Sequence, residues 1–91
     1  MAHKSYIRHT WQYNKMMALV RGLDLETVED YFQYIISSKI NGNLLQVRDL
    51  FRDMPKEYRK EFLSYLADEV ERESNGNTVY YQLLKLLIEE I

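Results

Sequence analysis

Cysteine is absent from this chain of 91 residues, which contains only one proline and three glycines. Without cysteine there is no disulfide framework, no thiolate nucleophile and no cysteine-based zinc site, and the composition suits a reducing cytosol. The first residues lack the apolar stretch of a signal peptide. The longest apolar run, residues 79–88, is interrupted by Gln82 and Lys85 and has about half the length of a membrane span. We therefore expect a cytoplasmic protein that crosses no membrane.

Groups that perform catalysis are also scarce. Both histidines, His3 and His9, lie near the start of the chain, and neither has a carboxylate at the spacing of a zinc-binding helix. No glycine-rich phosphate loop and no serine elbow occurs in the sequence. Carboxylates such as Glu57 and Glu61 pair at helical spacing, but without a further ligand they are typical of a solvated face. We expect no enzymatic activity, no catalytic residue, no metal and no cofactor.

The glycines and the proline lie between segments of apolar periodicity, a distribution typical of helix ends. No segment shows the alternation that a strand requires. A chain of this size, 46% apolar, can bury one core, so residues 1–91 form one domain. The sequence predicts an all-α fold, a compact single-domain bundle of about five short helices. Residues 1–9 are either disordered or the start of the first helix, because chain ends are often poorly ordered.

The first two helices are separated by a short turn. The first helix ends near Gly22, and Asp24 is the expected N-cap of a second helix that ends near Lys39. The apolar face of this second helix follows the spacing of three, four and three residues through Leu25, Val28, Phe32 and Ile35.

An Asn-Gly-Asn triplet separates the second helix from the third. Gly42 suits the left-handed position after a helix, and Asn43 suits the next N-cap, where Gln46 completes a capping-box pattern. The third helix stops at Asp53, because the residue before Pro55 is biased away from helical angles. Its inward side chains are expected to be Leu44, Val47, Leu50 and Phe51.

A fourth helix starts around Pro55 and ends before residue 75. Its apolar stripe is formed by Tyr58, Phe62, Tyr65, Leu66 and Val70. Four acids crowd its last turns, where the helix dipole disfavours negative charge: Asp68, Glu69, Glu71 and Glu73. We infer that cations approach this end, either Lys4 and Arg8 of the first helix or those of a partner.

The last helix, capped by Asn77 or Thr78, is apolar around about 220° of its circumference, twice what packing on one side of a bundle needs. The favoured interpretation is a central helix, the most buried of the five. The alternative is a homodimer or partner interface on this helix. Its candidate residues are Tyr80, Tyr81, Leu84, Leu87, Ile88 and Ile91.

Charge is unevenly distributed along the chain. Residues 1–23 carry four of the 12 cations and no acid, and the remaining residues carry all 14 acids. If the first helix reaches back to Lys4, then Arg8 and Lys15 lie within about 40° of it around the helix, and Trp11 lies beside them. The opposite side, predicted to face the core, carries Tyr6, Tyr13, Met17 and Val20.

This basic and aromatic face favours a protein partner. Trp11 is a suitable anchor for an acidic groove, with Lys4, Arg8 and Lys15 around it. The sequence therefore predicts a non-catalytic interaction module, a small regulator, adaptor or inhibitor that occupies a surface of a larger protein. Small acidic proteins without catalytic groups are often encoded by phages and mobile elements.

The alternative is a nucleic-acid-binding module. A basic helix with an aromatic residue can follow phosphates and stack a base. The second and third helices also have the connection of a helix-turn-helix pair, whose reading residues are then Asn43, Gln46 and Arg48. Asp49 and Asp53 on the same helix, and a net charge of −2, make nucleic acid the less favoured partner.

Overall fold

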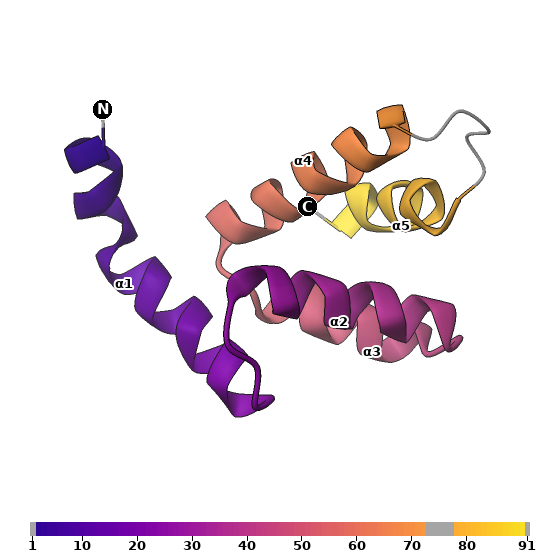
Figure 1. Ribbon diagram of the computed structural model, residues 1–91, viewed down its shortest axis with the longest axis horizontal. Helices are drawn as coiled ribbons and strands as arrows, with labels where there is room; N and C mark the ends of the chain where they lie inside the picture. The colour runs from indigo at the N-terminus through magenta and orange to yellow at the C-terminus, as the bar shows by residue number, and fades with distance from the viewer. Residues whose placement is uncertain (1, 73–77, 91) are drawn as a thin grey trace.

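The described residues form five α-helices and a final 3-10 turn (Figure 1). The structure is a computed structural model that describes residues 2–72 and 78–90, with side chains from residue 11 onward. The elements are α1 (Ala2–Gly22), α2 (Val28–Ile40), α3 (Leu44–Asp53), α4 (Lys56–Arg72), α5 (Val79–Leu87) and η1 (Ile88–Glu90). None of these residues belongs to a strand, and the predicted all-α bundle is confirmed.

Helix α2 lies at the centre of the packing and contacts α1, α3 and α5, while α4 packs along α5. An aromatic cluster joins α2, α3 and α4. The ring centroid of Phe62 lies 4.9 Å from that of Phe32 and 6.3 Å from that of Phe51. The side chains that α2 buries are Tyr31, Phe32, Ile35, Ile36 and Ser38.

The last helix is not the most buried element, contrary to the prediction. Leu83 and Leu87 are fully buried, whereas Tyr81 and Ile88 are 40% and 58% exposed. More buried side chains come from α2 than from α5. Helices α4 and α2 cover only part of the circumference of α5, so the rest of its apolar arc lies at the surface.

Helix α1 is attached to the bundle by its C-terminal half. Met16 and Val20, one turn apart, are fully buried, and α1 packs mainly against α2. In Figure 1 the N-terminal turns of α1 lead away from α4 and α5. The backbone of residues 2–9, for which the sequence left disorder open, is helical.

The turn after α1 corrects the role predicted for Asp24, which has a positive φ of 61°. The N–H of Leu25 donates to the Val20 carbonyl and that of Asp24 donates to the Arg21 carbonyl, each at 3.0 Å. This pair of bonds is a Schellman motif, in which the residue at positive φ closes the preceding helix. Asp24 therefore terminates α1 instead of capping α2.

The N-cap of α2 is Thr27. Its hydroxyl accepts a hydrogen bond from the Asp30 N–H at 3.1 Å, and the Asp30 carboxylate accepts one from the Thr27 N–H at 3.2 Å. This reciprocal capping box satisfies backbone donors at the start of the helix. This N-cap lies three residues beyond the predicted one, because Asp24 is already part of the preceding Schellman motif.

Replacing Asp24 with glycine is expected to raise the free energy of unfolding by about 0.5–1 kcal/mol, because glycine adopts a positive φ without steric cost. The change also removes a negative charge from the C-terminal end of α1, which the helix dipole disfavours. Chemical denaturation measures the effect. The matched variants are Asp24→Asn, which removes only the charge, and Asp24→Ala, which we expect to destabilise. An alanine variant as stable as the glycine variant would contradict the explanation.

The two remaining turns that the structure describes follow the sequence closely. Gly42 has a φ of 81°, and the side chain of Asn43 accepts a hydrogen bond from the Gln46 N–H. Met54 is extended, with a ψ of 145°, immediately before Pro55. The left-handed glycine, the N-cap of α3 and the stop at Asp53 are all confirmed.

Most apolar side chains assigned to the core of α3 and α4 are buried, with three exceptions. Leu44 is exposed because it begins α3 at the end of the bundle, and Tyr65 and Val70 are half-buried. Thr78 is the N-cap of α5, since its hydroxyl accepts from the Tyr81 N–H. The alternative cap, Asn77, lies outside the described residues.

Candidate functional site

The face of α1 that carries Trp11 lies at the surface. The Trp11 side chain is 62% exposed, and Lys15, one turn later, is also exposed. Met16 and Val20 anchor a different side of the helix in the core. The structure thus places Trp11 on a surface face and not in the core.

Two residues of the predicted basic face lie where only the backbone is described. Lys4 and Arg8 are in the first turns of α1, and their side chains are outside the described part of the structure. The helix does reach back to these residues, which is the condition for the basic face. Together with Lys15 and Arg21 they give residues 1–23 four cations and no acid.

The core side of α1 differs from the prediction at Tyr13. Its side chain is 48% exposed, Met17 is half-buried, and the fully buried residues are Met16 and Val20. The physical reason is that only the C-terminal half of α1 meets α2, so the buried stripe follows that contact. Tyr13 lies close enough to Tyr58 on α4 to add to the rise in the Tyr58 pKa, which burial and then Glu61 mainly cause.

The six candidate interface residues of the last helix separate into three groups. Leu87 is fully buried and Tyr80 and Leu84 are half-buried, so these three belong wholly or partly to the core. Tyr81 and Ile88 are exposed, and the Lys85 ammonium lies 6.0 Å from the centroid of the Tyr81 ring. Ile91 lies outside the described residues. Leu87 therefore does not line a surface available to a second chain.

The three residues assigned to nucleic-acid reading are held by contacts within the bundle. The amide group of Asn43 donates to the Gln46 Oε1 atom, and Gln46 Nε2 donates to the Tyr34 hydroxyl at 3.1 Å. Arg48 faces the Glu90 carboxylate at 3.6 Å. These side chains hold α3 against α2 and η1.

The acidic end of α4 lies at the far side of the molecule from the N-terminal turns of α1 (Figure 1). The N-terminal turns of α1, which carry Lys4 and Arg8, therefore do not approach this end of α4. The nearest cation described there is Arg72, whose guanidinium lies 3.7 Å from the Glu69 carboxylate. The acidic end and the basic face are two separate surfaces.

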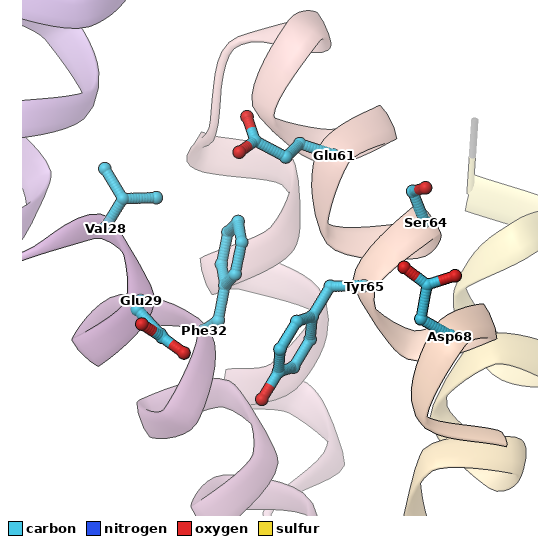
Figure 2. Close-up of a pocket in the computed structure, with 7 residues that line it drawn as sticks. All are labelled: Val28, Glu29, Phe32, Glu61, Ser64, Tyr65 and Asp68. Carbon is cyan, nitrogen blue, oxygen red and sulfur yellow. The ribbon is translucent and has the colours of Figure 1, made fainter. Parts of the chain in front are cut away.

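A hollow of about 340 Å³ lies between α2 and α4, and the sequence did not predict it. Figure 2 shows the rings of Phe32 and Tyr65 at its centre, with the carboxylates of Glu29, Glu61 and Asp68 around them. Val28 and Ser64 complete the lining. The sequence predicted a solvated face at Glu61 and an acidic helix end at Asp68, and it did not bring the two together. Only the packing of α2 on α4 adds the aromatic floor.

The acids of this hollow have no cationic partner in the described ranges 11–72 and 78–90. The carboxylates that form ion pairs within those ranges are Glu69 and Glu90, and not Glu29, Glu61 or Asp68. Within the same ranges, no three carboxylate or histidine groups come close enough to hold a metal ion. The hollow is thus an acidic, aromatic-floored surface feature.

Tyr65 connects the two helices that line the hollow. Its hydroxyl accepts a hydrogen bond from Gln33 Nε2 at 2.7 Å, which joins α2 to α4. Burial is the main cause of a raised Tyr65 pKa, followed by the charge of Glu69, while the bond from Gln33 acts in the opposite direction. The phenol is therefore neutral at pH 7, and the negative charge of the hollow comes from its carboxylates.

No protein-family model, curated protein or solved structure matches this chain. No helix among the described residues is long and apolar enough to span a membrane.

Proposed function

We propose that this protein is a non-catalytic interaction module that binds a surface of a larger protein through the α1 face around Trp11. The observation that supports the proposal most is the exposure of the only tryptophan, at 62%, on a helix anchored by its other side. Tryptophan is one of the residue types enriched among those that dominate the energy of protein interfaces.

The surroundings of Trp11 indicate the chemistry of the partner. Lys15 is exposed beside it, and the whole segment 1–23 carries no acid. Such a face fits an apolar pocket with an acidic rim, where the indole is desolvated and the cations steer the encounter.

We place the protein in the cytoplasm, because a chain without cysteine suits a reducing compartment.

A protein partner is better supported than nucleic acid. Asn43, Gln46 and Arg48 contribute to contacts inside the bundle, so their use in reading bases would require those contacts to break. The acidic hollow on α2 and α4 adds a surface that repels phosphates.

Replacing Trp11 with alanine is expected to weaken binding of the partner at least about tenfold, because the indole provides the apolar anchor. The free energy of unfolding should change by no more than about 0.5 kcal/mol, because the side chain is largely exposed. The measurement is affinity capture from nuclease-treated extract of the native host, followed by titration of the identified protein against both variants.

Ile40→Ala is the matched control, since Ile40 is 67% exposed at the end of α2, away from α1. It should retain the partner. Loss of binding in both variants, or in neither, would contradict a role for the α1 face. Binding that depends on nucleic acid and falls steeply with salt would favour the alternative function.

A further inference from the structure

The exposed face of α1 and the hollow between α2 and α4 are complementary in charge, and both carry aromatic side chains. The face presents Trp11 beside Lys15 on a segment with no acid. The hollow presents two aromatic rings surrounded by Glu29, Glu61 and Asp68, as Figure 2 shows. An indole can pack on the aromatic floor while ammonium groups meet the carboxylates around it.

The α1 face does not line the hollow of its own chain, whose lining residues belong to α2 and α4. Met16 and Val20 fix the helix against the bundle. Trp11 is five positions before Met16, which places it about 140° away around a helix of 3.6 residues per turn. Its side chain therefore leaves α1 on a side different from the one held by the core. With α1 held in this orientation, an occupant of the hollow that carries this face comes from a second molecule.

We propose that in the absence of its partner the α1 face docks into the α2–α4 hollow of a second copy of the chain. This inference rests on the proposed function, because it uses the same face. Each copy carries both the face and the hollow, so two copies can exchange them reciprocally in a twofold dimer. Self-association then covers Trp11, and the larger partner must compete with the second copy for the α1 face.

Paired charge reversal tests this dimer in the full-length chain. Lys15→Glu and Glu61→Lys are both changes of exposed residues, one on the face and one at the hollow. Each variant alone brings like charges together, so the dissociation constant of the dimer should rise at least about tenfold. An equimolar mixture restores opposite charges at both contacts of the mixed dimer. Sedimentation velocity over a concentration series should then show dimers in the mixture but not in either variant.

Two further charge reversals serve as matched controls, Lys60→Glu on α4 and Asp49→Lys on α3, both at exposed residues outside the hollow. They should leave the dissociation constant within about threefold of the original value, since exposed charges away from a contact are screened. Circular dichroism and melting temperature confirm that every variant is folded.

A strictly monomeric wild-type chain at millimolar concentration would overturn this inference. So would a dimer that resists both reversals, or a mixture that fails to recover it. A dimer disrupted by Ile88→Asp and not by Lys15→Glu would place the interface on α5 instead. If the wild type is monomeric while Trp11→Ala still loses the larger partner, this inference fails and the proposed function stands.

Discussion

Replacing Phe62 with alanine is expected to lower the free energy of unfolding by about 3–5 kcal/mol. Phe62 is fully buried and its ring lies between those of Phe32 and Phe51, which belong to α2 and α3. Alanine removes the apolar surface that joins three helices and leaves a cavity that they can only partly close. Proteins of this size are stable by about 5–13 kcal/mol, so the variant should lose a large part of its stability.

Urea denaturation followed by far-ultraviolet circular dichroism measures the loss. Phe62→Leu is the conservative control and should cost less than about 1.5 kcal/mol, because it keeps most of the buried volume. Tyr81→Ala removes an aromatic ring of comparable size from the surface of α5 and should change stability little. If Phe62→Ala were no more destabilising than Tyr81→Ala, the aromatic cluster would not be the centre of the core.

Replacing Tyr31 with phenylalanine is expected to lower the free energy of unfolding by about 1–3 kcal/mol at pH 7. The buried Tyr31 hydroxyl donates a hydrogen bond of 2.8 Å to the Leu50 carbonyl, near the end of α3. In a continuing α-helix the Met54 N–H would donate to the Leu50 carbonyl. Here it donates to the Phe51 carbonyl instead. Phenylalanine therefore removes the partner that the tyrosine provides to a carbonyl in the last turn of the helix.

The same residue makes stability depend on alkaline pH. Burial raises the Tyr31 pKa far above its usual value, and the charge of Asp53 raises it further. Above about pH 10 the phenol ionises in the unfolded chain but keeps its proton in the folded one. The unfolded state then binds fewer protons, so stability falls as pH rises, by up to about 1.4 kcal/mol per pH unit for this group.

The free energy of unfolding of the wild type and of Tyr31→Phe is measured by denaturant titration at several pH values between 8 and 11. The difference between the two proteins isolates the contribution of Tyr31. The difference in the free energy of unfolding between the two proteins should be largest below about pH 10 and should decrease above it. If this difference stayed constant across the pH range, the Tyr31 phenol would ionise equally in the folded and the unfolded chain, which would contradict the prediction.

Local features of the fold could be predicted where a few neighbouring residues decide the conformation. Gly42 needs a positive φ after α2, and Met54 is extended because Pro55 follows it. Asp24 was assigned wrongly because aspartate suits both an N-cap and a left-handed position, and its neighbours do not distinguish them. The hydrogen bonds that the Val20 and Arg21 carbonyls accept show that Asp24 closes the first helix.

Burial could be predicted only in part, because it depends on which helices meet. The apolar arc of the last helix suggested a central position, but α4 and α2 cover just part of it, and Tyr81 and Ile88 remain exposed. In the same way, the helical layout of α1 placed Trp11 with the cations, yet the stripe that enters the core runs through Met16 and not Tyr13.

The amino-acid sequence by itself determined the all-α class, most helix ends and the absence of acidic residues from the first helix. Those properties depend on composition and on contacts between residues a few positions apart. Tertiary structure alone decided that Trp11 lies at the surface and that Glu29 and Phe32 of α2 form one hollow with Tyr65 of α4. Residues more than 30 positions apart become neighbours only when two helices pack, and no local pattern records which faces they turn toward each other.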